Sequence, residues 1–138
     1  CREASTMRVL FDTNLVLDIL LQRPGFADVG MALAQTREPW LSTLSVANVC
    51  YILGRAKTDQ IVGPLEFMRH KFRLAPLGDE QVARAVELNY DDFEDAMQVA
   101  CAEGEQIPFL ATRNLNHFQS SSRITILSGG ELLERLSL

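Results

Sequence analysis

The chain has few of the residues that build disulfide frameworks or zinc sites. Its 138 residues include only two histidines and three cysteines (Cys1, Cys50 and Cys101), which lie far apart and form no C-x-x-C pair. An odd number of widely separated cysteines predicts reduced, mostly buried thiols. The sequence therefore argues against a disulfide-stabilised or zinc-stabilised protein.

Long apolar runs and an excess of positive charge are also missing. No run approaches the roughly 18 apolar residues of a membrane span, and residues 1–6 contain no signal-peptide stretch. We therefore expect a cytoplasmic protein with no membrane contact. The formal net charge of −5 argues against a protein that coats nucleic acid, because such binding needs a basic face that releases counterions from phosphates.

The basic residues form two modest local clusters. One holds Arg55 and Lys57, and the other is the segment MRHKFR, residues 68–73. A solvated helix end is the favoured interpretation of both, with contact to a nucleic-acid backbone as the alternative. Any nucleic-acid chemistry must therefore be local.

The remaining composition is that of one globular domain. With 47% apolar and 22% charged residues, the chain is balanced for folding rather than for disorder. We expect residues 1–6 to form a disordered extension and residues 7–138 to form a single domain. No repeat, low-complexity segment or linker divides it.

Short apolar strands alternate with amphipathic helices along the chain. Strands are predicted at 8–11, in WLST, in KFRLAPL, in PFLAT and in ITIL; helices are predicted at 14–21, 26–37, 44–54, 58–69, 79–89, in DDFEDAMQVACAEG and in SGGELLERL. This alternation predicts an α/β fold whose central parallel sheet is covered by helices on both faces.

Polar side chains follow three of the predicted strands. They are Asp12, Thr13 and Asn14; Ser42 and Thr43, with Ser45 and Asn48 further along the next helix; and Thr112, Arg113 and Asn114. In open α/β sheets, the functional crevice lies at the carboxyl ends of the strands. For Asp12, helix capping is the alternative interpretation.

A fourth contribution comes from the acidic start of the helix DDFED. Asp92 and Asp95 share a face at a spacing of three, and Asp91 lies near Asp95 at a spacing of four. Such like charges repel, so a divalent cation is a natural compensation, and Mg²⁺ or Mn²⁺ suits oxygen ligands. A favourable interaction with the helix dipole is the alternative for Asp91 and Asp92. For Asp18 we favour a solvent-facing position.

These segments resemble the PIN domain, the nuclease domain of many bacterial toxin–antitoxin toxins. The resemblance covers about residues 7–136 and rests on VLFDTNLVLDILL, LSTLSVANVCYIL, DFEDAMQVACA and LATRNLNHF. It is strongest to the bacterial subgroup whose second segment reads S-x-x-S-x-A-N. It implies a three-layer α/β/α fold, an acidic cleft holding Mg²⁺ or Mn²⁺, and metal-dependent cleavage of single-stranded RNA.

Carried onto this chain, the resemblance assigns roles to individual residues. It implies that Asp12 and Asp95 are catalytic and hold the metal, with Asp92 as a further ligand and Asn114 as a further catalytic residue. The residues expected to position water and substrate are Asn14, Asn48, Thr112 and Arg113. His117, taken alone, is interpreted as a surface or hydrogen-bonded histidine.

Two departures from the family pattern reduce the acidity of the expected site. Asn48 stands where many PIN domains have glutamate, and His117 stands where aspartate is frequent. An amide offers a carbonyl oxygen but neither balances a cation nor acts as a base. The non-enzymatic alternative is therefore a PIN-like module that acts through protein contacts. A haloacid-dehalogenase-like phosphatase is a weaker alternative, because Asn14 stands where that family needs a second aspartate.

The resemblance also implies an antitoxin partner and a homodimer. Five apolar residues of the first helix exceed what one helix face buries: Leu15, Val16, Ile19, Leu20 and Leu21. Core packing is the favoured interpretation, with a dimer surface as the alternative.

Overall fold

A five-stranded parallel sheet forms the centre of the protein. The computed structural model describes residues 7–54, 58–118 and 123–137. Its strands are β1 (Arg8–Phe11), β2 (Glu38–Ser42), β3 (Arg73–Ala75), β4 (Phe109–Ala111) and β5 (Thr125–Leu127). They lie in the order β3-β2-β1-β4-β5, and every neighbouring pair is parallel. The predicted parallel sheet is confirmed.

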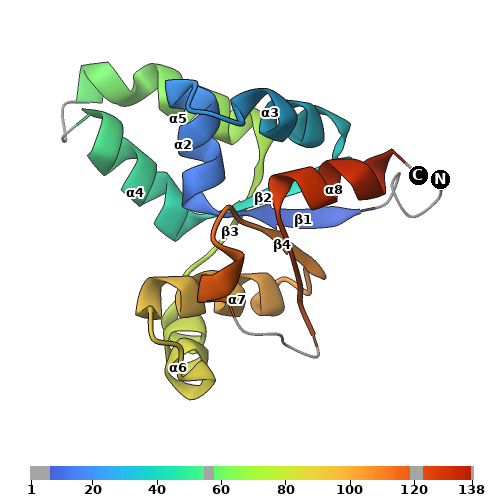
Figure 1. The fold of residues 1–138 in the computed structure, drawn as a ribbon. Coiled ribbons are helices and arrows are strands. Elements are labelled where there is room, and N and C mark those ends of the chain that lie inside the picture. Colours follow the sequence, from blue (N-terminus) through green and yellow to red (C-terminus); the bar gives the residue numbers. More distant parts are fainter. Residues whose placement is uncertain (1–6, 55–57, 119–122, 138) are drawn as a thin grey trace.

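Helices cover both faces of this sheet, which gives three layers (Figure 1). One layer contains α2 (Thr13–Leu21), α3 (Phe26–Gln35), α4 (Thr43–Gly54), α5 (Thr58–Lys71) and α8 (Gly129–Leu136). The other contains α6 (Asp79–Leu88) and α7 (Phe93–Gly104). A short 3₁₀ helix, η1 (Leu115–His117), follows β4. The three-layer α/β/α fold predicted from the sequence is confirmed.

The strands contribute to two cores because successive side chains point to opposite faces. Val9 and Phe11 of β1 pack with residues of α2, α3, α5 and α8, whereas Leu10 packs with residues of α7 on the other face. Strands buried on both faces read as continuous apolar runs. This is why RVLF and PFLA carry no polar alternation.

The strand order makes the carboxyl end of β1 the natural position for a site. From β1 the chain continues to β2 on one side, whereas β4, on the other side of β1, is added later, so the order reverses between β1 and β4. Phe11 pairs with Ala111, and the Asp12 amide donates to the Ala111 carbonyl at 2.9 Å. The residues that follow these two strands therefore meet at a topological switch point, where open α/β sheets bind ligands.

Local side-chain hydrogen bonds set several helix boundaries. The hydroxyl of Ser42 accepts from the Ser45 amide at 3.0 Å, so Ser42 caps α4. Helix α3 ends at Gln35, two residues earlier than predicted. Thr36 is extended, and its hydroxyl donates to the Ala32 carbonyl at 2.7 Å, which closes the last turn.

The prediction that Asp18 faces solvent is wrong. Asp18 is buried, with ion pairs from its Oδ1 to Arg23 Nε at 2.8 Å and to Arg113 Nη1 at 2.9 Å. Arg23 lies after the end of α2 and Arg113 follows β4, so the neighbours of Asp18 come from outside its own helix. The helical spacing did not reveal these partners.

The apolar residues of α2 mostly serve the core. Leu15 and Val16 are fully buried, and Ile19 and Leu20 pack partly buried against the same core, whereas Leu21 is exposed. The predicted extension at residues 1–6 and the cluster of Arg55 and Lys57 lie outside the described residues. Within the described part of the chain, no helix is long and apolar enough to span a membrane.

Candidate active site

A cleft lies at the carboxyl edge of the sheet, beside α4 and the start of α2. Figure 1 shows β1 leading into α2 at this edge, with the start of α4 beside the junction. The volume of the cleft is about 470 Å³. Side chains from α2, α4, α7 and the segment after β4 line it: Asp12, Thr13, Asn14, Asn48, Tyr51, Ile52, Asp92, Glu94, Asp95, Asn114 and His117. The structure therefore brings together most of the site residues predicted from the sequence.

Asp12 is fixed in orientation by two hydrogen bonds. It is the N-cap of α2, where its Oδ1 accepts from the Thr13 amide at 2.8 Å, and its Oδ2 accepts from the Thr112 hydroxyl at 2.9 Å. Asp12 is only 5% exposed. Burial raises its pKa, opposed by these two hydrogen bonds. Asp12 therefore caps α2 and also lines the cleft.

Asp95 is less satisfied than Asp12. It lies in the first turn of α7, and its Oδ2 is buried with no hydrogen-bond partner among the described residues. Burial, followed by the nearby charges of Asp92 and Asp12, raises its pKa to about 7. The nearest opposing group is His117, whose Nδ1 lies 3.8 Å from Asp95 Oδ2. At that distance the contact is too long for a hydrogen bond.

Two more carboxylates enter the cleft from the start of α7. Asp92 caps this helix, and its Oδ1 accepts from the amides of Glu94 at 2.9 Å and Asp95 at 3.2 Å. Glu94 Oε1 accepts from the Asn48 side-chain amide at 2.7 Å. Burial, and then the charges of Asp92 and Asp12, raise the pKa of Glu94. Asn48 therefore orients an acid instead of being one.

The remaining predicted residues divide into two groups. Asn14 and Asn114 line the cleft. Thr112 is fully buried behind it, where its hydroxyl also accepts from the Asn114 amide at 3.1 Å, so it orients Asp12 rather than facing the cleft. The Arg113 side chain is held by Asp18 and is not among the residues that line the cleft.

The donor set of the cleft fits a hard divalent cation. Most of its polar groups are carboxylate and amide oxygens, with the imidazole of His117 beside them. One of the oxygens, Asp95 Oδ2, is buried and lacks a hydrogen-bond partner in the described residues. Among the described residues, no group of three or more histidine, cysteine, aspartate or glutamate side chains is arranged to hold a metal ion. Mg²⁺ is commonly held through one or two carboxylates, with water and substrate phosphates completing its shell. Two carboxylates remote in sequence, Asp12 and Asp95, line this cleft.

Sequence reasoning missed two residues around the cleft. Tyr51 is strongly exposed and lines the cleft from α4, and Gln98 is fully buried beneath it on α7. Gln98 lies three residues after Asp95, so the same helical spacing that joined Asp92 to Asp95 was a usable signal for it. Tyr51 carried no such signal, because it reads as part of the apolar run of α4.

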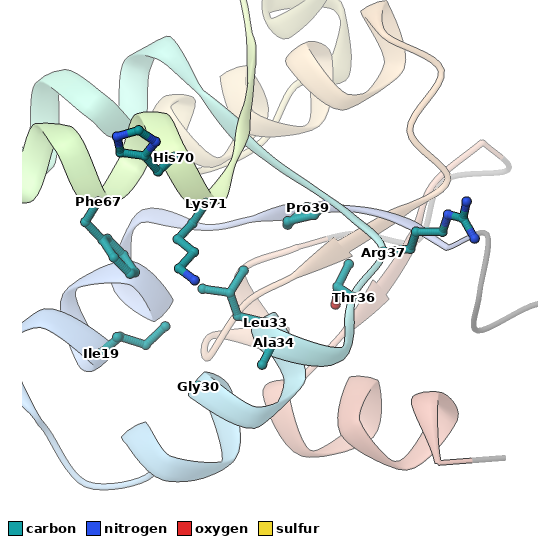
Figure 2. A pocket seen from close by; sticks show the side chains of 10 residues that line it. All are labelled: Ile19, Gly30, Leu33, Ala34, Thr36, Arg37, Pro39, Phe67, His70 and Lys71. Carbon is teal, nitrogen blue, oxygen red and sulfur yellow. The ribbon is translucent and has the colours of Figure 1, made fainter.

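A second cavity, of about 350 Å³, lies between α2, α3 and α5. Figure 2 shows Ile19, Leu33 and Phe67 pointing toward one another there, with Lys71 beside Leu33. Arg37 and His70 also line this cavity. It combines an apolar wall with a basic margin and contains none of the cleft residues.

The fold and the cleft define a class, the three-layer α/β/α domains with an acidic site at the switch point of a parallel sheet. The sequence profile of the PIN domain matches residues 8–116, and the chain belongs to the PIN domain family. This assignment removes the basis for the phosphatase alternative. A comparison with curated proteins finds no match.

Solved structures share the fold at low sequence identity. A toxin–antitoxin complex from Klebsiella pneumoniae is 21% identical, with 85% of this chain and 95% of that chain covered and a TM-score of 0.66. DNA-bound VapBC from Salmonella typhimurium is 14% identical, with coverages of 90% and 99% and a TM-score of 0.67. VapBC2 from Rickettsia felis, bound to a promoter DNA fragment, is 16% identical, with coverages of 88% and 98% and a TM-score of 0.69.

Proposed function

We propose that this PIN domain is a metal-dependent ribonuclease that cleaves single-stranded RNA and acts as the toxin of a toxin–antitoxin system. PIN domains are generally nucleases. The observation that carries the proposal is that Asp12 and Asp95, remote in sequence, line one cleft, where Asp95 Oδ2 is buried without a partner. Burying a carboxylate without a partner is unfavourable, and such perturbed groups cluster at functional sites, so we expect these two to act in binding or catalysis.

In this proposal Asp12 and Asp95, with Asp92, hold Mg²⁺ or Mn²⁺. Such an ion lowers the pKa of water and offsets charge on a phosphate. Asn14, Asn48 and Asn114 line the same cleft and can donate hydrogen bonds to water or to phosphate oxygens. Thr112 keeps the Asp12 carboxylate oriented.

The surroundings of the cleft favour an unpaired strand as the substrate. Tyr51 lines the cleft with its ring strongly exposed. Exposed aromatic rings stack on bases that are free to leave their neighbours, and the bases of a duplex are not free to do so.

The proposed compartment is the cytoplasm. The free cysteines Cys50 and Cys101 suit a reducing compartment.

The test combines metal binding with RNA cleavage. Calorimetric titration of the wild-type protein with Mn²⁺ is expected to release or absorb measurable heat, and a single-stranded RNA is expected to be cut faster than the same strand in a duplex. A chelator is expected to stop cleavage, and Asp12→Asn is expected to slow it strongly. An Asp12→Asn protein that cuts RNA as fast as the wild type would refute the nuclease proposal.

The proposed antitoxin partner would use the second cavity (Figure 2). Its apolar wall of Ile19, Leu33 and Phe67, with Arg37 and Lys71 at the margin, suits a segment that presents an apolar side chain next to a carboxylate. The solved toxin–antitoxin complexes share this fold. Phe67→Ala and Lys71→Glu are each expected to reduce co-purification with the protein encoded beside this one, and co-purification unchanged by both would refute this location.

A homodimer completes the proposal. Leu21 and Met31 expose apolar surface on α2 and α3, which a second copy would cover. Sedimentation is expected to give the mass of a dimer, and Leu21→Glu with Met31→Glu is expected to give the mass of a monomer. A wild-type protein that sediments as a monomer would remove this part.

The second candidate is a PIN domain that binds partners without cutting RNA. It is favoured by Asn48 and His117 in place of acids, and by the finding that no group of three or more ligating side chains in the described residues is arranged for a metal. Fewer carboxylates weaken cation binding. No heat with Mn²⁺ and no cleavage, together with intact co-purification of a partner, would favour this candidate.

A further inference from the structure

Four polar side chains form a buried cluster directly beneath the cleft. Thr13, Ser42, Ser45 and Gln98 come from the start of α2, the end of β2, α4 and α7. All four are buried, and Ser42, Ser45 and Gln98 have no exposed surface. Two of them, Ser42 and Ser45, are the serines of the S-x-x-S-x-A-N segment, for which the proposed function has no direct use.

Gln98 and Ser45 are the centre of the hydrogen bonding in this cluster. The Gln98 side-chain amide donates to the Ser45 hydroxyl at 2.7 Å and to the Thr13 hydroxyl at 3.3 Å. The hydroxyls of Thr13 and Ser45 lie 2.7 Å apart, and the Ser42 hydroxyl donates to Ser45 at 3.2 Å. One amide therefore joins three segments that are distant in sequence.

The cluster is a costly way to fill the core. Within the described part of the chain, the carbonyl oxygen of Gln98 is buried without a hydrogen-bond partner, and an unsatisfied buried acceptor is unfavourable. Apolar side chains of similar volume would fill the same space with no such penalty. Stability alone therefore does not account for these residue types.

Three members of the cluster lie close in sequence to a residue that lines the cleft. Thr13 follows Asp12, Ser45 precedes Asn48 by one helical turn, and Gln98 follows Asp95 by one helical turn. Directional hydrogen bonds fix separation and rotation more closely than apolar contacts do. The amide thus ties the helix of Asp95 to the strand end of Asp12 and to the helix of Asn48.

We propose that Gln98 is a positioning residue, whose amide, through the hydroxyls of Thr13 and Ser45, sets the separation of Asp12 and Asp95. This inference rests on the proposed function. Gln98 is fully buried, so it acts only through the segments that it joins. Outer residues that orient metal ligands typically change metal affinity or activity by about 10- to 100-fold when they are replaced.

The test separates position from stability by removing the cluster in two ways. Gln98→Leu leaves the hydroxyls without their donor, so the thermal midpoint and the Mn²⁺ affinity are both expected to fall. The triple variant Thr13→Val, Ser45→Ala and Gln98→Leu removes the Gln98 amide together with both hydroxyls that it contacts, and Ser42 still accepts from the amide of residue 45. This variant is expected to recover most of the thermal midpoint while its Mn²⁺ affinity stays about tenfold or more below that of the wild type.

Ser45→Ala and Ile107→Val complete the set. Ser45→Ala removes the central hydroxyl without adding bulk, and it is expected to weaken Mn²⁺ binding and to lower kcat while the KM for RNA stays unchanged. Ile107 is fully buried just before β4, at the amino ends of the strands and so at the opposite end of the sheet from the cleft. Ile107→Val is therefore expected to lower the thermal midpoint and leave Mn²⁺ affinity at the wild-type value.

Two results would overturn the inference, and they are distinguishable. If the wild type binds Mn²⁺ and the triple and Ser45→Ala variants bind it equally well, the cluster is only structural and the proposed function stands. If the wild type itself shows no heat with Mn²⁺ and no metal-dependent cleavage, the proposed function fails and the positioning role fails with it.

Discussion

Nearly buried carboxylates occur in two different surroundings in this protein. Asp18 is paired with Arg23 and Arg113, and Glu103 is paired with Arg84 at 2.7 Å. In the cleft, by contrast, the described groups that act on the pKa of Asp12 and Asp95 include other carboxylates and His117, but no lysine or arginine. The charges of Asp18 and Glu103 are balanced by arginines. For Asp12 and Asp95, no lysine or arginine of the described residues lowers the pKa in this way.

This difference teaches which acids the fold needs and which it only tolerates. A buried carboxylate paired with arginine contributes to stability as long as both partners remain. A carboxylate surrounded by its own kind is destabilising until a cation arrives, and perturbed groups of this sort cluster at functional sites. The comparison predicts opposite consequences for substitutions that are chemically identical.

The largest expected effect is on catalysis. Asp95→Asn is expected to slow RNA cleavage by about 100-fold or more, since it removes a proposed ligand and outer-shell changes alone reach about that size. Asp18→Asn is the matched control, because it neutralises a buried aspartate outside the cleft, and it is expected to leave cleavage within a few-fold of the wild type. Initial rates on one single-stranded RNA measure both. Equal losses in the two variants would abolish the distinction between the two kinds of carboxylate.

The second effect is on stability, where the ranking of the same two variants is expected to reverse. Asp18→Asn leaves two arginines without their shared partner, so the free energy of unfolding is expected to fall by about 1–3 kcal/mol. Asp95→Asn removes a charge that lacks a counter-ion, so without metal the free energy of unfolding at about pH 8 is expected to rise by about 1 kcal/mol or more. Urea denaturation with a chelator present measures both. A destabilised Asp95→Asn protein would contradict the argument.

The third expectation concerns pH. Because the pKa of Asp95 is raised from 3.8 to about 7, the folded protein binds more protons than the unfolded chain between these values. The contribution of Asp95 to stability therefore falls as the pH rises through this range and stays low above it. Burial raises the pKa of Asp12 in the same direction.

The measurement is metal-free unfolding at about pH 5 and about pH 8. When the pH is raised from about 5 to about 8, the free energy of unfolding is expected to fall more for the wild type than for Asp95→Asn. Mn²⁺ at about 100 times its dissociation constant is expected to restore about 2.7 kcal/mol at the higher pH. Identical pH profiles of the two proteins would show that ionisation of Asp95 does not destabilise the fold.

The sequence predicted the fold better than the surroundings of its acids. The apolar runs RVLF, WL, PFLA and ITIL, three of which precede a predicted helix, were enough to predict a parallel sheet, and the strand ends located Asp12 and Asn114 at one edge. Helical spacing also joined Asp92 to Asp95. These are local patterns, and they depend on backbone geometry alone.

The partners of individual side chains were not predictable in the same way. The sequence predicts a solvent-facing Asp18 because no helical period relates this residue to its two partners, Arg23 and Arg113. The contact of Gln98 with Thr13 and Ser45 likewise depends on how three segments pack. Long-range side-chain contacts follow from the tertiary structure, and a periodic pattern carries no information about them.

The smallest expected effect sharpens the comparison inside the cleft. Asn48→Asp restores an acid at the position where many PIN domains have glutamate, and it replaces the hydrogen bond from Asn48 to Glu94, 2.7 Å long, with a repulsion between two carboxylates. Without metal the variant is expected to lose about 0.5–1 kcal/mol of stability, because a hydrogen bond is lost and a like charge is added at a half-buried position. With metal the added carboxylate is expected to tighten Mn²⁺ binding by about threefold to tenfold, since more ligand charge favours a divalent ion.

Calorimetry and thermal unfolding of the same preparations measure the two effects. Asn48→Ala is the control, because it breaks the hydrogen bond without adding charge and so should lose stability without gaining affinity. If Asn48→Asp bound Mn²⁺ no better than Asn48→Ala, a carboxylate at position 48 would not contribute to the ion, and the proposed ligand set would not extend to α4.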